Sequence, residues 1–189
     1  LARLTDALGS IDEAVKLAPD DSTVHAVRAF VLDWNANPAL VGDKQAQAYL
    51  TEAETEAVSA LNKDNQNTLA LAFYAEILVD QQKWTQAEQN ILQALEREDA
   101  DQLMDVHRVY AYVLESLGAY NQAIQEYDKA IAISPNLTFL YLRAGANYRR
   151  LAFGSLNEDS ARVLYEKSLE YFQKAALINE QLEVYDPIP

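Results

Sequence analysis

The sequence has 189 residues, a formal net charge of −14 and no cysteine. Without cysteine the chain has no disulfide, no catalytic thiol and no Cys-ligated zinc. The negative charge disfavours non-specific binding to nucleic acid and to anionic membranes, since both require positive charge on the protein.

The predicted elements are helices, which recur in pairs along the chain. Glycine and proline number only 5 each, which favours helix over strand. The second helix of each pair is marked by two small residues seven positions apart. In chain order these markers are Ala7/Ala14, Ala53/Ala60, Ala87/Ala94, Ala123/Ala130 and Ser168/Ala175. The first helix shows a 3–4 spacing typical of one helix face, as in His25-x-x-Arg28-Ala29-x-x-Leu32.

These markers predict a single repeat array over residues 1–189. Its predicted parts are 1–19 (the second helix of a truncated repeat), 22–65 (a repeat with an insertion), 68–99, 104–136, 138–180 (a second repeat with an insertion) and a tail at 181–189. Because the array starts on a second helix, we expect a first helix to precede residue 1.

Both insertions are expected to be a loop followed by a lengthened second helix. Pro38 and Gly154 are predicted to stop the first helices of these two repeats. Asp43 and Asn157 are the predicted N-caps of the helices that follow.

The pattern resembles the tetratricopeptide repeat, a helical hairpin with W-x₂-L-G-x₂-Y in its first helix and A-x₃-F…P in its second. The match is best over 104–136, where Ala123, Tyr127, Ala130 and Pro135 follow the second motif. The resemblance covers residues 1–180 and implies an all-α fold, a right-handed superhelical array of antiparallel helix hairpins (an α-solenoid). It also implies that the first helices line a concave surface. No repeat has the Trp, and Arg28 occupies a normally apolar position.

Catalytic, cofactor and metal sites are not expected. His25 and His107 are the only histidines, and they occupy equivalent positions in different repeats, too far apart to share a metal ion. We expect each of them to fill a packing position. Glu52, Glu54 and Glu56 are not expected to share a helix face, and the chain has no phosphate-binding glycine loop and no dinucleotide-binding motif.

A partner-binding groove is the candidate site, formed by the exposed face of the first helices. Phe30, Tyr112 and Phe139 are interpreted as aromatic anchors that packing between hairpins does not need, and the arginines as groups that hold carboxylates. The alternative places the arginines on a solvated flank, with Arg149 and Arg150 paired to Glu158 or Asp159, and lets Phe139 cover the preceding helix. The predicted site residues are Phe30, Asp33, Trp34, Glu76, Arg108, Tyr112, Phe139, Arg143, Arg149 and Arg150.

The predicted function is that of a non-enzymatic scaffold that binds a peptide or helix of a partner protein in this groove. The Lys, Asn and Arg set with which some tetratricopeptide domains grip a chaperone carboxylate is absent, because the matching positions hold Ala72, Glu76 and Val109. We expect a protein or peptide partner, no nucleic acid and no direct membrane insertion. The alternative is a self-associating or spacer module of a larger protein or complex, which could regulate an attached enzyme. Under this alternative the chain could form a homo-oligomer.

Overall fold

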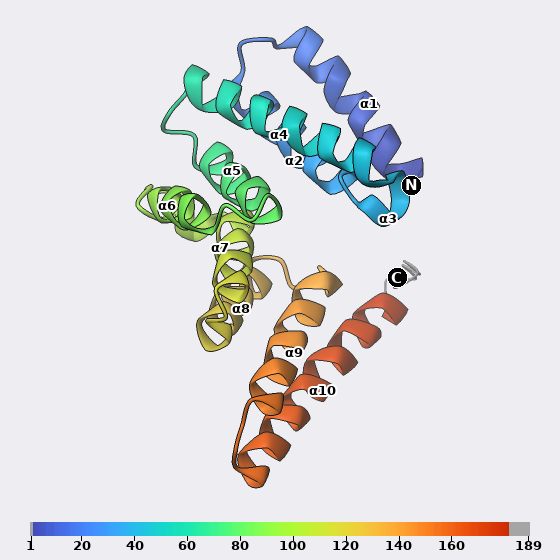
Figure 1. Ribbon diagram of the computed structural model, residues 1–189, viewed down its shortest axis with the longest axis vertical. Helices are drawn as coiled ribbons and strands as arrows, with labels where there is room; N and C mark the ends of the chain where they lie inside the picture. Colours follow the sequence, from blue (N-terminus) through green and yellow to red (C-terminus); the bar gives the residue numbers. More distant parts are fainter. Residues whose placement is uncertain (1, 182–189) are drawn as a thin grey trace. The chain divides into compact units, whose positions relative to one another are not determined.

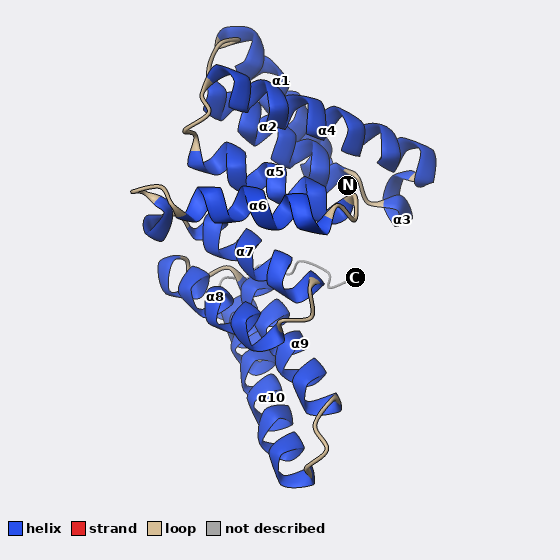
Figure 2. Ribbon diagram, turned by 60° about the vertical axis from the view of Figure 1, so that its left-hand side comes forward, coloured by secondary structure: helices blue, strands red, loops and turns tan. Residues whose placement is uncertain are grey.

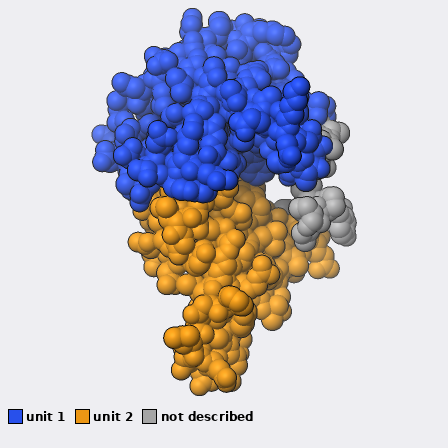
Figure 3. Space-filling model, viewed as in Figure 1, with its two compact units in different colours: residues 1–101 blue, residues 102–189 orange. Residues whose placement is uncertain are grey.

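The computed structural model describes residues 2–181, which form helices and connecting turns without a β-strand in that range. The chain divides into two compact units, residues 1–101 and 102–189 (Figure 3). The predicted tail, apart from Gln181, lies outside the described residues. The all-α prediction is confirmed, whereas the prediction of a single array remains a prediction.

Unit 1 contains the helices drawn from blue to green in Figure 1. Helix α2 packs on α1, α4 and α5, the short α3 packs on α4, and α5 packs on both α4 and α6. The bounds are α1 Ala2–Leu17, α2 Ser22–Asn35, α3 Pro38–Val41, α4 Asp43–Lys63, α5 Thr68–Asp80 and α6 Trp84–Leu95. A 3₁₀ turn, η1, follows at Ala100–Gln102.

The core of unit 1 consists largely of alanine and branched aliphatic side chains. Ala29 of α2 and Ala53 and Ala57 of α4 are completely buried in one cluster with Leu32 and Ile77. Alanine at these positions lets the helix backbones approach closely, so the seven-residue spacing of small residues reflects a steric requirement of the packing.

The first insertion forms a separate short helix. Helix α2 ends at Asn35, and Pro38 then starts α3, where its fixed φ suits the first helical position. The side chain of Asn37 caps α3 by accepting a hydrogen bond from the Ala39 N–H, 3.0 Å away. The predicted cap at Asp43 is wrong: Gly42, with φ +82°, takes the cap position, and Asp43 is the first residue of α4.

Up to residue 181, unit 2 consists of four α-helices that pack in chain order, α7 on α8, α8 on α9 and α9 on α10 (Figure 2). Their core includes Ala123, Tyr127, Ala130, Leu140 and Ala144, all buried. The bounds are α7 Met104–Ser116, α8 Tyr120–Ile133, α9 Thr138–Phe153 and α10 Glu158–Gln181.

The second insertion leads into a long final helix. Gly154 follows the end of α9, and the Asn157 side chain accepts a hydrogen bond from the Ser160 N–H at 2.8 Å, which confirms the predicted cap. Helix α10 has 24 residues, of which two, Ser168 and Ala175, are buried. Ser168 Oγ donates to the Gly145 carbonyl of α9 at 2.8 Å, so the two helices are in close contact at this point.

Candidate functional site

In unit 1 the predicted site residues are largely used in packing. The Phe30 ring stacks on Phe73 of α5, with centroids 4.7 Å apart, and lies 5.3 Å from the Trp34 ring. The interpretation that Phe30 is not needed for packing between hairpins is therefore wrong. Asp33 and Glu76 are buried, whereas the Trp34 residue is 41% exposed. Trp34 is thus the more exposed aromatic residue of this pair.

A charged cluster in unit 1 was missed by sequence reasoning. Arg28 donates from Nε to Asp12 at 2.8 Å, from Nη2 to Glu52 at 2.6 Å and from Nη1 to Glu56 at 2.8 Å. Glu52 and Glu56 are one helical turn apart and share the face of α4 that meets Arg28, whereas Glu54 lies on another side of the helix. The three glutamates therefore do not share one face, as expected, but two of them do. The acceptors Asp12, Glu52 and Glu56 explain how an arginine occupies a position that is apolar in the repeat pattern.

The two histidines, as expected, fill packing positions. His25 is buried, with Nδ1 2.6 Å from Glu56 Oε2 and Nε2 2.8 Å from the Pro19 carbonyl. His107 is buried in unit 2, with Nδ1 2.7 Å from Glu126 Oε2. In each case a histidine of a first helix bonds a carboxylate of the next long helix, which is a structural role.

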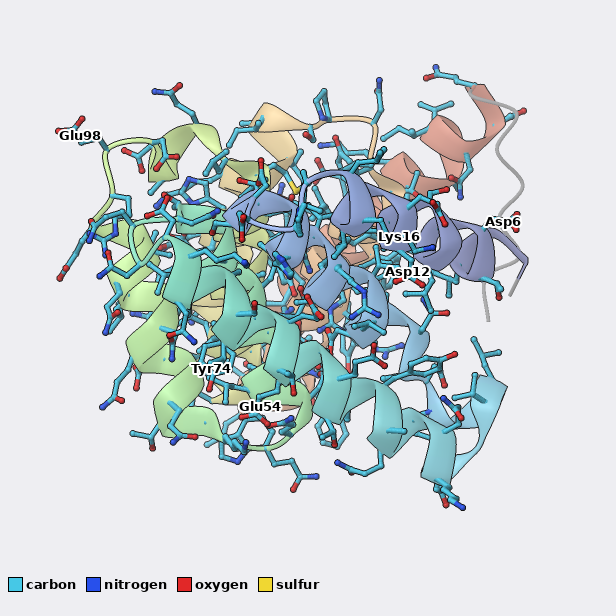
Figure 4. All side chains as sticks on the ribbon, turned by 90° about the horizontal axis from the view of Figure 1, so that it is seen from above. Asp6, Asp12, Lys16, Glu54, Tyr74 and Glu98 are labelled. Carbon is cyan, nitrogen blue, oxygen red and sulfur yellow. The ribbon has the colours of Figure 1, made fainter. Side chains whose placement is uncertain are left out.

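Glu54 points to another side of α4 and joins it to α5. It accepts hydrogen bonds from Lys83 at 2.8 Å and from Gln81 at 2.9 Å, and it lies beside Tyr74 (Figure 4). Burial alone would raise the pKa of Glu54, but the bonds from Lys83, Gln81 and Tyr74 outweigh it and hold that pKa below its ordinary value. Glu54 therefore stays ionised and acts as a connection between helices.

In unit 2 two predicted arginines meet one buried carboxylate, that of Glu115 near the end of α7. Arg150 Nη1 lies 2.5 Å from Glu115 Oε1, and Arg143 Nε lies 3.4 Å from Glu115 Oε2. The same Oε2 accepts hydrogen bonds from the Tyr127 hydroxyl at 3.1 Å and from Asn147 Nδ2 at 2.9 Å. We call Glu115, Tyr127, Arg143, Asn147 and Arg150 the Glu115 cluster.

The Tyr127 hydroxyl both donates to Glu115 and accepts from Arg143 Nε, 3.2 Å away. Burial raises the pKa of Tyr127 far above its ordinary value, so its phenol stays neutral and keeps its proton for Glu115. Burial opposes the charge on Arg143, but Tyr127 and Glu115 outweigh it and raise the pKa of Arg143. Arg143 therefore stays charged and Tyr127 stays neutral within the cluster.

Both arginines keep one side open to solvent. The Arg143 guanidinium lies over the Tyr112 ring at 4.7 Å, and that of Arg150 lies 5.6 Å from the Tyr120 centroid. Their side chains are 41% and 45% exposed. A guanidinium has several N–H donors, and within residues 2–181 the two terminal NH₂ groups of Arg143 and the Nε and Nη2 of Arg150 have no hydrogen-bond partner. These donors can take further acceptors.

The remaining predicted residues of unit 2 differ in their surroundings. Arg108 is buried, and its Nε donates to Asp105 at 2.9 Å. Phe139 packs partly buried against the unit 2 core, as the alternative interpretation expected. Arg149 is exposed, and no partner for it occurs among the described residues.

The alternative ion pairs predicted for the arginines do not form. Asp159 binds Arg162 at 3.0 Å, and Arg150 binds Glu115. Arg149 and Arg150 instead line an open pocket of about 460 Å³ at the end of α9, together with Tyr120, Phe153, Gly154 and Tyr165. Sequence reasoning missed these four residues, because they come from three segments that share no repeat position.

Residues 2–181 contain no group of three or more His, Asp or Glu side chains able to hold a metal ion. None of the helices in this range combines the length and the apolarity that crossing a bilayer requires.

Solved structures with a similar fold share little sequence with this chain. MamA, a tetratricopeptide-like protein, has a TM-score of 0.58 and 16% identity, covering 96% of this chain and 92% of its own. The human IFIT1 dimer with m7Gppp-AAAA has a TM-score of 0.77 and 16% identity, covering 96% of this chain and 39% of IFIT1. The chain has a tetratricopeptide-like helical repeat fold. No protein-family model and no curated protein matches its sequence.

This tetratricopeptide-like fold confirms the family resemblance at the level of architecture. Identities of 16% show the fold alone, because unrelated functions occur on the same fold. Of the predicted residues, Tyr112, Arg143 and Arg150 lie together with Glu115, and Phe30 lies with Trp34 in the other unit.

Proposed function

We propose that the chain is a non-enzymatic protein-interaction scaffold whose unit 2 binds an acidic segment of a partner protein. The observation that supports this most directly is the Glu115 cluster, in which one buried carboxylate holds two half-exposed arginines. The cluster has a net charge of about +1, and exposed Arg149 adds another positive charge beside it. Local positive charge of this kind is unusual on a chain whose net charge is −14.

The geometry suits carboxylates because the arginines are already held in place. Glu115 fixes one edge of each guanidinium, and the Tyr112 ring supports the face of Arg143. A partner carboxylate can then accept two parallel hydrogen bonds from the open edge without a large loss of side-chain entropy. Tyr112 would add an apolar contact beside the arginines.

The proposed ligand of unit 2 is a segment of a protein and not a nucleic acid. IFIT1, one of the structural neighbours, is seen with m7Gppp-AAAA, so phosphate-bearing ligands are the competing class. A polyanion would have to approach a chain with 29 acidic and 15 basic residues, and this repulsion disfavours it. A short acidic peptide segment needs only the local arginines.

The test compares proteins captured by the wild-type chain and by two variants, Arg149→Gln and Arg143→Gln. Matched controls are Lys174→Gln and Lys129→Gln, which remove the same charge elsewhere in unit 2, and all variants are first checked for folding by thermal unfolding. We expect partners that the arginine variants lose and the lysine variants keep, with binding then measured on the purified partner. If the arginine variants and the lysine variants capture the same proteins, the surface formed by Arg143, Arg149 and Arg150 is not the binding surface.

Self-association is the second candidate, favoured by helix α10. Its 24 residues include exposed Val163, Leu169 and Leu177, and exposed apolar side chains of this kind occur at interfaces. Sedimentation of wild type and Leu169→Glu/Leu177→Glu over a range of concentrations tests it. A mass that rises with concentration in wild type alone supports a dimer through α10, and a constant monomer mass in both excludes it.

A further inference from the structure

The pocket at the end of α9 lies directly beside the Glu115 cluster, because Arg150 belongs to both. Tyr120 begins α8, Phe153 ends α9 and Tyr165 lies two turns into α10, so three helices of unit 2 provide its walls. The walls thus combine two guanidinium groups with three aromatic rings. Pockets that bind ligands typically have this mixture of apolar walls and a few oriented polar groups.

The aromatic walls expose apolar surface that the fold of unit 2 does not use. Phe153 is 86% exposed and Tyr165 is 46% exposed, and neither belongs to the buried core. Leu156, in the turn between α9 and α10, is also fully exposed. Apolar side chains gathered at one place on a helical hairpin are a feature of interaction sites, whereas single exposed ones are ordinary.

The positive charge of Arg149 and Arg150 in the pocket lining indicates which chemical group the pocket would bind. Arg149 has no partner in residues 2–181, and Arg150 uses Nη1 for Glu115 while its Nε and Nη2 stay available. Asp159, in the first turn of α10, is paired with Arg162 at 3.0 Å and not with Arg149 or Arg150. A carboxylate from outside is therefore the complementary group, and it would lie beside the aromatic walls.

We infer that this pocket receives a large apolar side chain, preferably aromatic, which follows or precedes an acidic residue in the bound partner segment. The inference rests on the proposed function, since it defines which acidic segment unit 2 selects. The acidic residue binds Arg149 and Arg150, and the ring of the neighbouring residue lies between Tyr120, Phe153 and Tyr165. Aromatic residues with arginine around them are the usual anchors of protein interfaces.

The experiment is a selection of displayed random peptides of about twelve residues, long enough to fill a groove and its edge. It is run in parallel against the complete wild-type chain, Tyr165→Ala/Phe153→Ala and Arg149→Gln, with Leu177→Ala and Lys174→Gln as controls on the same unit. Sequencing of the bound pools gives the enrichment of acidic and aromatic residues. Enriched peptides are then synthesised with their aromatic residue intact or changed to alanine, and their affinities are measured.

We expect wild type and both controls to enrich acidic residues next to Phe, Tyr, Trp or Leu. Changing the aromatic residue of the peptide to alanine should weaken binding by about tenfold, and this difference should disappear in Tyr165→Ala/Phe153→Ala. Arg149→Gln should reduce the acidic preference. A nucleotide or inorganic phosphate that displaces these peptides at low concentration would overturn the inference in favour of a phosphate ligand.

Failure of the pocket and failure of the proposed function give different results. Acidic peptides that bind equally well with or without an aromatic residue would overturn the pocket and leave the arginine face intact. Peptides selected without any acidic preference, or no selected peptides at all, would contradict both. An aromatic preference that survives in Tyr165→Ala/Phe153→Ala would place the aromatic contact elsewhere and also overturn the inference.

Discussion

Polar contacts from two neighbouring helices converge on Glu115. It is buried on α7, it accepts from Tyr127 of α8, and it meets Arg143, Asn147 and Arg150 of α9. A single carboxylate on α7 thus binds four polar side chains of α8 and α9. Removing it should therefore affect stability more than its one side chain suggests.

Glu115→Gln is expected to lower the free energy of unfolding by about 2 kcal/mol, because it weakens charge-assisted hydrogen bonds to a partly buried pair of arginines. The arginines are about two-fifths exposed, and their access to water limits the loss. Urea unfolding measures the change. Glu166→Gln, an exposed change on α10, is the control, and equal stability of the two variants would contradict the prediction.

Glu126 gives the chain a pH-dependent contribution. Burial alone would raise its pKa, but hydrogen bonds from His107 and Lys129 outweigh burial and hold the pKa below the ordinary value. A carboxyl whose pKa is lower in the folded state stabilises the fold above the unfolded pKa, about 4.3, and loses that contribution as the pH falls through the folded pKa.

The stability advantage of wild type over Glu126→Gln should therefore be complete near pH 7 and should shrink as the pH drops below about 4. Chemical unfolding of both proteins at a series of pH values measures this difference. A difference that stays constant down to acidic pH would show that the ionised carboxylate is not the source of the stabilisation.

At the scale of elements, the contact between α9 and α10 depends on one missing side chain. A Cβ on Gly145 would lie 2.8 Å from Phe172 Cε1 and 3.2 Å from the Ser168 carbonyl oxygen. The ring can give way, but the backbone oxygen of Ser168 belongs to α10 itself. The helices must then separate, which would also stretch the bond from Ser168 Oγ to the Gly145 carbonyl.

Gly145→Ala is expected to destabilise the chain by about 1–3 kcal/mol through overpacking, despite the better helix propensity of alanine. Gly9→Ala is the matched control, because Gly9 lies within α1 and its added Cβ would meet nothing within 4 Å. Thermal unfolding should show opposite signs for the two variants. Phe172→Leu in the Gly145→Ala background should recover part of the loss, and no recovery would point away from the ring contact.

The helices were well predicted because small side chains recur at a fixed seven-residue spacing, which can be read directly from the sequence. Ala123, Ala130, Ser168 and Ala175 are all buried at helix contacts, as their spacing indicated. The cap at Asp43 was misplaced because Gly42, with its positive φ, ends the preceding turn.

The candidate site was harder to predict, because it depends on long side chains whose rotamers no repeat pattern specifies. The seven-residue spacing of Arg143 and Arg150 is compatible both with side chains that face solvent and with side chains that contact a neighbouring helix. Only the structure shows that both reach back to Glu115, one repeat earlier in the chain.

At the scale of the whole molecule, net charge and local charge have opposite signs. A chain of net charge −14 repels an acidic peptide at long range, and the arginines attract it only near contact. Raising the salt from about 50 mM to about 300 mM screens the long-range repulsion. We therefore expect the association rate constant of an acidic peptide to rise with salt, and its dissociation rate constant to rise as well.

Stopped-flow fluorescence with a labelled acidic peptide measures both rate constants. The usual case, in which salt slows association through loss of electrostatic steering, is the opposite outcome and would contradict the prediction. Lys174→Gln, which makes the net charge more negative without touching the arginines, should slow association further at low salt.

Glu115 also behaves as a permanent internal competitor for any acidic partner. Each bond it makes to Arg143 or Arg150 occupies a donor that an incoming carboxylate could use, so the same carboxylate that stabilises the helices limits the attraction between chain and ligand. Glu115→Gln keeps an amide oxygen that can still hold the arginines but removes the competing negative charge, so it should bind acidic peptides more tightly while unfolding more easily. In that case the two carboxylate oxygens of Glu115 stabilise the fold and weaken the binding of an acidic peptide. Evolution of a stronger binder from this fold would then pass through a less stable protein.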